Sequence, residues 1–255
     1  MDSLVIDWDS LQARRSPVDA LTRDEAVLRS IRAQCILGLL PERDLMAMVR
    51  QSSPRFLQKN RVMFRMGDEG RSVVLILQGY VKLSTMTANG REVVLEIAGP
   101  GTIFGELAVL NGSPRQADAT TLTSCRVVAI EGGLFRRALV ATPEAMLATI
   151  RLLSQRLSAI TSRELDAVSL PAPVRLAKAL LRLAKLHSVR LEDGMQIGFR
   201  LSQRELGAMT GLIRESINKH LKAWRAAGWV DLSGGGLTIR DVRALQEYVR
   251  DNEAP

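Results

Sequence analysis

The feature that most constrains the fold is a run of short apolar segments between residues 55 and 130, separated by glycine-containing turns. Each segment is only a few residues long, which suits a strand better than a helix. Asn89-Gly90 is the clearest hairpin turn, because both residue types tolerate a positive φ. The pattern predicts a compact antiparallel β-barrel or roll, with strands near 62–64, 73–77, 81–85, 93–97, 119–123 and 126–130.

The segments on both sides of this region have apolar residues at helical spacing, so we expect a chain that contains both helices and strands. Two small helices are predicted between residues 24 and 49, after a polar arm over residues 1–25. A long helix is predicted after Pro143, where apolar residues alternate in steps of four and three, the spacing of a coiled-coil seam. The seam predicts a homodimer; alternatively, the stripe packs on the chain's own barrel. Its residues are Met146, Ile150, Leu153, Leu157 and Ile160.

Net charge and composition limit the classes of function that this chain can have. The net charge is +8, and residues 172–255 carry 14 Lys and Arg against 9 Asp and Glu, an excess compatible with a nucleic-acid partner. The chain has two cysteines, two histidines and no evident catalytic set, so we expect neither a metal site nor an enzyme. No stretch reaches the roughly 18 apolar residues of a spanning helix, which predicts a cytoplasmic protein without a membrane partner.

The segment from Phe104 to Ala117 combines a glycine entering a short helix, a glutamate just inside it and an arginine after a tight turn. Backbone N–H groups at a helix start suit a phosphate, and Gly105 allows it to approach closely. Arg115 can add a charge-assisted contact. Glu106 would repel a phosphate but can accept a hydrogen bond from a ribose hydroxyl. Phosphate and ribose together predict a nucleotide ligand.

These residues resemble the phosphate-binding cassette of cyclic-nucleotide-binding domains, as in the cAMP receptor protein family. The resemblance implies that Glu106 binds the ribose 2′-hydroxyl, while Arg115 and nearby backbone amides hold the cyclic phosphate. The implied ligand is cAMP, with cGMP as the alternative, because the family more often has Ala, Ser or Thr where this chain has Gln116. The same alignment places Thr161 where the family offers a hydroxyl to the purine; a solvent-facing threonine is the alternative. The implied phosphate-binding amides are those of Gly105, Leu107, Ala108, Gln116 and Ala117.

A second pattern follows Leu201 and predicts two helices joined by a tight turn. Ser202 and Glu205 form a capping box at the first helix. Gly207 is small enough for two helices to cross closely, and Gly211 makes the turn between them. The glycine-rich segment 233–236, between two short apolar segments, predicts a hairpin wing. Their order predicts a winged helix-turn-helix.

This pattern resembles the DNA-binding domain of the same family, and the resemblance covers about residues 28–245. It implies that the second helix, over about 213–226, enters the major groove. There Arg214 can bridge guanine O6 and N7, and Glu215 can accept from cytosine N4. The predicted DNA-contacting residues are Ser202, Gln203, Arg214, Glu215, Ser216 and Lys219, with Arg204, Lys222 and Arg225 assigned to phosphates or solvent. Two departures from the family are Ile213, in place of a capping Ser or Thr, and His220, at a customarily apolar position.

The predicted fold is α+β, with an N-terminal cyclic-nucleotide-binding β-roll (jelly-roll), a long dimerisation helix and a C-terminal winged helix-turn-helix. We expect a cyclic-nucleotide-responsive regulator that binds palindromic double-stranded operator DNA, with half-sites of the TGTGA kind, and RNA polymerase. The alternative is a nucleotide-independent DNA-binding regulator whose β-roll only scaffolds dimerisation. The expected domains are the arm 1–25, the β-roll domain 26–142, the dimerisation helix 143–170 and the DNA-binding domain 171–255.

Overall fold

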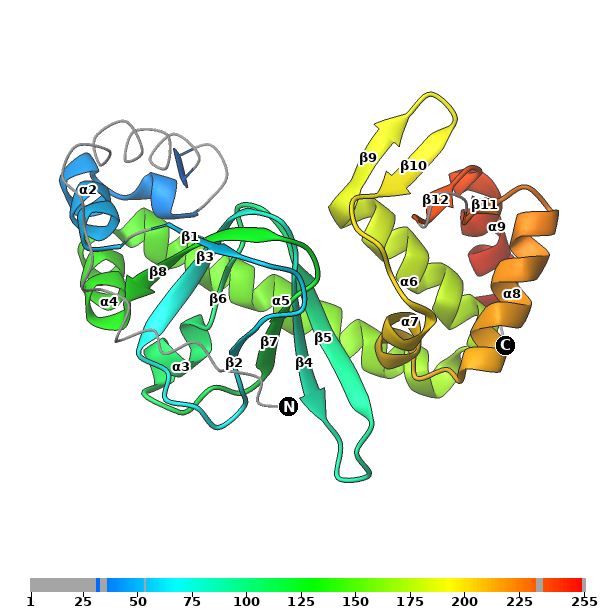
Figure 1. The fold of residues 1–255 in the computed structure, drawn as a ribbon, viewed down its shortest axis with the longest axis horizontal. Helices are drawn as coiled ribbons and strands as arrows, with labels where there is room; N and C mark the ends of the chain where they lie inside the picture. Colours follow the sequence, from blue (N-terminus) through cyan, green and yellow to red (C-terminus); the bar gives the residue numbers. More distant parts are fainter. Residues whose placement is uncertain (1–30, 33–35, 53, 233–235, 254–255) are drawn as a thin grey trace. The chain divides into compact units, whose positions relative to one another are not determined.

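The computed structural model describes residues 31–32, 36–52, 54–232 and 236–253. The predicted arm 1–25, Cys35 and the turn residues 233–235 of the predicted wing lie outside this part. The chain divides into two compact units. In Figure 1 the first unit is coloured from blue to green and the second from yellow-green to red, except for one hairpin tip of the second unit, which has the colour of the strands that it joins. The first unit includes residues up to Thr85 and Leu95–Arg156, and the second includes Met86–Val94 and the chain from Leu157 onward.

The first unit is built on a β-roll of two four-stranded sheets, which confirms the predicted fold class. The strand orders are β1-β8-β3-β6 and β2-β7-β4-β5. All six predicted strands are present to within two residues at each end, and β1 and β6 are additional. The strands are β1 (Arg55–Leu57), β2 (Val62–Phe64), β3 (Ser72–Gln78), β4 (Val81–Met86), β5 (Glu92–Ala98), β6 (Ile103–Phe104), β7 (Asp118–Thr121) and β8 (Cys125–Glu131).

Strand β3 is buried on both faces, which explains its unbroken apolar sequence. Val74 and Ile76 belong to the core between the two sheets, together with Phe104. Val73 and Leu75 belong to a second core that includes residues of the covering helices. Because successive side chains of a strand point to opposite faces, one strand contributes to both cores.

Short helices cover the outer face of the β3–β8 sheet. One of them, α4, follows β8 directly and was not predicted. It begins where the Glu131 carboxylate accepts hydrogen bonds from the backbone N–H groups of Gly133 and Leu134, each at 2.7 Å. The helical elements of this unit are η2 (Ile36–Leu39), α2 (Glu42–Gln51), α3 (Glu106–Asn111), α4 (Gly132–Ala141) and the first part of α5 (Pro143–Ser169).

In its described residues, the second unit contains the last part of α5, four further helices and a small sheet of order β11-β12-β10-β9 (Figure 1). Strands β11 and β12 pair antiparallel on either side of the predicted wing turn, so a hairpin flanks that segment. The β9–β10 hairpin and the last helix are additions to the predicted elements. The elements are α6 (Ala172–His187), β9 (Ser188–Leu191), β10 (Gly194–Ile197), α7 (Gln203–Thr210), α8 (Arg214–Ala226), β11 (Val230–Asp231), β12 (Thr238–Ile239) and α9 (Val242–Glu253).

A short proline-containing break separates α5 from α6. Helix α5 ends at Ser169 and α6 begins at Ala172, so only Leu170 and Pro171 connect them. Pro173 lies in the first turn of α6 rather than in a linker. Proline is tolerated there, because the first N–H groups of a helix have no intrahelical partner.

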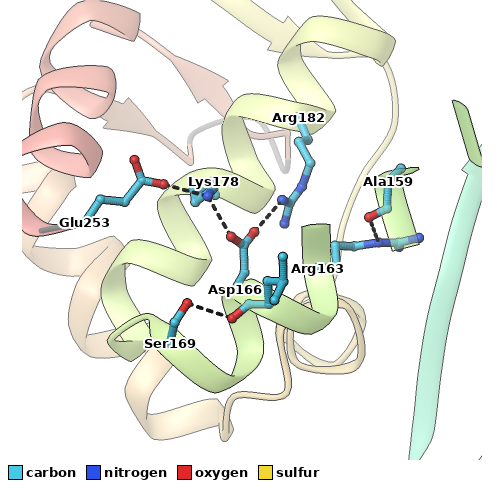
Figure 2. A network of polar contacts seen from close by, with 8 residues as sticks. Ala159, Arg163, Asp166, Ser169, Lys178, Arg182 and Glu253 are labelled. Atoms are coloured by element: carbon cyan, nitrogen blue, oxygen red, sulfur yellow. Dashed lines mark hydrogen bonds and ion pairs between the residues drawn. The ribbon is translucent and has the colours of Figure 1, made fainter. Parts of the chain in front are cut away.

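An ion-pair network joins the end of α5 to α6 and α9 (Figure 2). The Asp166 carboxylate, with 9% of its side chain exposed, accepts from Lys178 Nζ at 2.6 Å and from Arg182 Nη1 at 2.9 Å. Lys178 Nζ also donates to Glu253 Oε1 at 2.6 Å. Because both Asp166 oxygens are bonded to α6, the network fixes the direction in which the chain leaves α5.

We predict that Asp166→Asn lowers the free energy of unfolding by about 1–3 kcal/mol, because two hydrogen bonds to charged donors are weakened. Burial raises the pKa of Asp166, but the bonds from Lys178 and Arg182 outweigh it and leave the pKa below its ordinary value. Stability from this group is therefore present above about pH 4 and lost as the pH falls further. Urea denaturation between pH 3 and 7 measures both effects. Asp251→Asn, which changes an exposed carboxylate, is the control; equal losses in both variants would contradict the prediction.

Candidate nucleotide site and DNA interface

Gly105 lies between β6 and α3, and a glycine is required there by the backbone conformation and by a close side chain. Its φ of 81° is in the left-handed region, which favours glycine. A Cβ at this position would also collide with Nη1 of Arg115. The glycine therefore allows the Arg115 guanidinium to lie directly against the start of α3.

Arg115 is almost fully buried, with 4% of the residue exposed. Its Nη1 donates to the Gly105 carbonyl at 3.0 Å, its Nη2 donates to Ser72 Oγ at 3.2 Å, and its guanidinium carbon lies 4.2 Å from the centre of the Phe64 ring. Burial lowers the pKa of Arg115, and the nearby Asp68 and Glu106 carboxylates oppose that shift. An arginine stays charged in proteins, so this is a fixed positive charge. Its Nε is buried and has no hydrogen-bond partner in the described part of the chain.

Glu106 is the second buried charge of the cassette, with 1% of the residue exposed. Its Oε1 accepts from Nη1 of Arg156 on α5 at 2.6 Å. Arg156 also lies 3.0 Å from Glu96 Oε2 through its Nε and donates from Nη2 to the Ile103 carbonyl at 2.8 Å. Although burial acts to lower the pKa of Arg156, Glu106 and Glu96 raise it overall.

The residues present fit a cyclic nucleotide. Glu106 Oε2 is buried and has no hydrogen-bond partner among the described residues, so it offers an acceptor to a ribose hydroxyl. Arg115 Nε is a buried donor without a partner, and it carries the charge that a phosphate needs. Unsatisfied buried polar atoms are uncommon in folded proteins, and a ligand is one explanation for them.

The other predicted nucleotide residues occupy different environments. Leu107 and Gln116 are exposed, Ala108 is buried and Ala117 is half-buried, all close in sequence to Gly105 or Arg115. Thr161 is exposed, on the part of α5 that belongs to the second unit.

Sequence reasoning missed Ser72 and Arg156, which hold the two charged side chains of the cassette. A signal for Arg156 was available, because a buried glutamate needs a cationic partner. The chain has 35 Lys and Arg residues, however, and contacts across 50 positions cannot be read from spacing.

In the second unit, α7 and α8 form the predicted helix-turn-helix. The Ser202 Oγ accepts from the backbone N–H of Glu205 at 3.1 Å, and Glu205 Oε2 accepts from the Ser202 N–H at 2.6 Å, which confirms the capping box. Gly211 has a φ of 71° at the turn. A Cβ on Gly207 would lie 2.9 Å from the Leu212 carbonyl oxygen, so this glycine allows the close passage that the sequence suggested.

The predicted base-reading face of α8 is open to solvent. Arg214, Glu215 and Lys219 are exposed and Ser216 is half-buried, whereas Ile217, Leu221 and Trp224 are buried on the opposite face. Gln203, at the start of α7, is half-buried, and its Oε1 accepts from Arg214 Nε at 3.0 Å.

The two departures from the family pattern, Ile213 and His220, lie in different environments. Ile213 is the N-cap residue of α8, and no side chain caps this helix. His220 packs against Trp224 with ring centres 6.1 Å apart. Burial and the neighbouring Lys219 lower the pKa of His220, so its neutral form is favoured and it fits a half-apolar position.

Comparisons with known proteins match both units. Residues 54–142 match the cyclic nucleotide-binding domain family, and residues 174–248 match the Crp-like helix-turn-helix domain family. Within the described residues, no helix is long and apolar enough to cross a membrane, and no group of three or more metal-ligating side chains gathers.

Similar proteins include a CRP-like cAMP-activated global transcriptional regulator of Mycobacterium tuberculosis, 30% identical over 219 residues that cover 86% of this chain and 97% of the relative. A solved CRP-family transcriptional regulator of Thermus thermophilus aligns with a TM-score of 0.65 and 25% identity, covering 77% of this chain and 96% of that one. The c-di-GMP-responsive global regulator of Xanthomonas campestris aligns with a TM-score of 0.64 and 25% identity, covering 78% and 97%. With a DNA-binding helix-turn-helix behind a cyclic nucleotide-binding domain, this chain belongs to the family of CRP-like transcription regulators.

Proposed function

We propose that this regulator responds to a cyclic nucleotide, with cAMP as the first candidate and cGMP as the second. The observation that supports this most is a pair of buried atoms that have no hydrogen-bond partner among the described residues, the acceptor Glu106 Oε2 and the donor Arg115 Nε. A cyclic nucleotide offers a ribose hydroxyl and a charged phosphate, which are the complements of these two groups. The relative from Mycobacterium tuberculosis is named as cAMP-activated.

In this proposal each residue of the cassette has one role. Glu106 accepts the ribose 2′-hydroxyl, and Arg156 holds the Glu106 carboxylate in place. Arg115 holds the phosphate together with the backbone N–H groups around Gly105 and Gln116. When bound, the nucleotide would supply a negatively charged phosphate and a ribose 2′-hydroxyl. Because Arg156 lies on α5, binding at the cassette acts on that helix through Glu106.

The identity of the nucleotide depends on groups beyond the phosphate. Gln116 is exposed beside Arg115, where it can contribute an amide to either purine. Thr161 is proposed to reach a base only across a dimer, so its role depends on assembly. A relative of the same fold is named as responsive to c-di-GMP. The titrations below therefore compare different nucleotides.

The proposed assembly is a homodimer formed along α5. Most of the predicted seam is left uncovered by the chain itself: Ile150 is 53% exposed, Leu157 66% and Ile160 40%. An apolar stripe of this length on one helix indicates a partner helix. A dimer would present two recognition helices to successive major grooves of a palindromic operator.

The alternative, a nucleotide-independent regulator, is favoured by a specific observation. Arg115 is already bonded to Gly105 and Ser72, and Glu106 is already paired with Arg156. A cassette whose charges are largely compensated by the protein could serve as a scaffold alone.

We predict that calorimetric titration with cAMP or cGMP gives saturable binding, and that Arg115→Ala weakens it about 10- to 100-fold. This variant removes charge-assisted hydrogen bonds to the phosphate. Arg61→Ala, which changes an exposed arginine of the same unit, should bind like the wild type. Absence of heat with either nucleotide, in folded protein that still binds DNA, would support the alternative.

The same titration with 2′-deoxy-cAMP isolates the role of Glu106. The wild type should prefer cAMP over the deoxy ligand by about tenfold, the value of one hydrogen bond to a charged group. Equal affinities would mean that Glu106 does not bind the ribose, even if the nucleotide is bound.

We predict that Leu157→Asp converts a dimer into a monomer at micromolar concentrations, because it places a charge within the apolar seam. Sedimentation velocity measures the change. Ser158→Asp adds the same charge to an exposed neighbour and should leave the dimer intact. A monomeric wild type, or a dimeric Leu157→Asp protein, would overturn the proposed seam.

We predict that Arg214→Ala reduces discrimination among bases at one position of each half-site by about 1–3 kcal/mol, because a bidentate contact to guanine is lost. Gel-shift titration on operators selected from random duplex DNA, and on their point variants, gives this value. Lys222→Ala, on an exposed residue assigned to phosphates or solvent, should instead weaken all sequences alike, if at all. Full selectivity in Arg214→Ala would show that this arginine reads no base.

A further inference from the structure

Gln203 bridges two residues of the recognition helix. Its side chain crosses from the first turn of α7 to α8, where its Oε1 accepts from Arg214 Nε at 3.0 Å and its Nε2 donates to Asn218 Oδ1. Arg214 and Asn218 are four positions apart, so they are neighbours on one face of α8. One half-buried amide is therefore bonded to two exposed side chains.

The bond to Gln203 does not use the Nη1 and Nη2 groups of Arg214, which are the groups that can contact a base. A guanidinium has five N–H groups in one plane, and only the Nε–H is used by Gln203. The four N–H groups on Nη1 and Nη2 remain for the O6 and N7 acceptors of guanine. An exposed arginine without such a bond would sample many rotamers, and ordering them opposes binding.

Asn218 gains a similar restraint. Its Oδ1 accepts from Gln203, which leaves the two N–H groups of its amide and one lone pair directed elsewhere. An asparagine amide is the group that pairs with adenine N6 and N7 in the major groove. Asn218 is exposed between Glu215 and Lys219 on the same helix, although the sequence analysis did not include it in the reading set.

We propose that Gln203 is a positioning residue for base readout, which orients Arg214 and Asn218 before DNA is bound, and that Asn218 is an additional specificity-determining residue. This inference rests on the proposed function, in which Arg214 reads a base. It differs from a direct contact between Gln203 and a DNA phosphate, which carries no sequence information. Preorganised side chains lose less entropy on binding, so the bridge should increase discrimination rather than general affinity.

The test compares selectivity with general affinity in full-length Gln203→Met, which keeps the side-chain length and removes both hydrogen bonds. Gel-shift titration on a selected duplex and its point variants should show about tenfold less preference at the positions read by Arg214 and Asn218. Affinity for unrelated duplex DNA, and its dependence on salt, should stay as in the wild type. Gln203→Glu keeps the acceptor for Arg214, so preference at the Arg214 position should be retained while the added charge weakens all DNA binding.

Asn218→Ala and Arg214→Ala identify which position each residue reads. If Gln203→Met weakens all sequences alike with a smaller salt dependence, Gln203 binds phosphate and the inference is wrong. If Arg214→Ala loses selectivity while Gln203→Met and Asn218→Ala do not, the proposed function stands and this inference alone fails. If Arg214→Ala keeps full selectivity, the proposed base assignment fails as well.

Discussion

The buried ion pair between Glu106 and Arg156 is the interaction on which the rest of the cyclic nucleotide-binding domain depends. An isolated carboxylate at 1% exposure would be destabilising by several kcal/mol, or would take up a proton. Arg156 compensates that charge from α5, and Glu96 on β5 shares the guanidinium. The cassette is therefore held to the long helix by this ion pair, because removing Arg156 would leave the buried Glu106 carboxylate without it.

The same helix carries a second fixed charge near its C-terminal end. Asp166 is bonded to Lys178 and Arg182 of α6, and a connection of two residues leaves little freedom between the helices. Helix α5 thus has a polar anchor in each unit, with an exposed apolar stripe along it. A ligand can influence DNA binding only through a difference in its affinity for two states. Helix α5 is the element whose position is restrained by both polar anchors.

Local patterns were predictable from the sequence, whereas contacts between distant residues were not. The cassette, the Ser202 capping box and the Gly211 turn each depend on residues within a few positions, so their spacing indicates their structure. Helix α4 was missed because its cap, Glu131, is also the last residue of β8, so no break separates strand from helix. Arg156 and Ser72 were missed because the fold brings them to the cassette across 50 and 43 positions from Glu106 and Arg115. The bonds of Gln203 to Arg214 and Asn218 were not predicted, because they exist only once α7 and α8 are packed.

The two charged residues of the cassette each keep one atom available to a ligand. Arg156 bonds only one oxygen of Glu106, and Glu106 Oε2 has no hydrogen-bond partner among the described residues, so a ribose hydroxyl can be accepted while the ion pair is kept. Arg115 donates from Nη1 to Gly105 and from Nη2 to Ser72, and its buried Nε–H has no partner in the same part of the chain, so a phosphate can be bound while those bonds are kept. Because protein contacts already fix the groups that a ligand would meet, binding would require little reordering of these side chains. The pair of Glu106 and Arg156 is the connection that joins the cassette to α5.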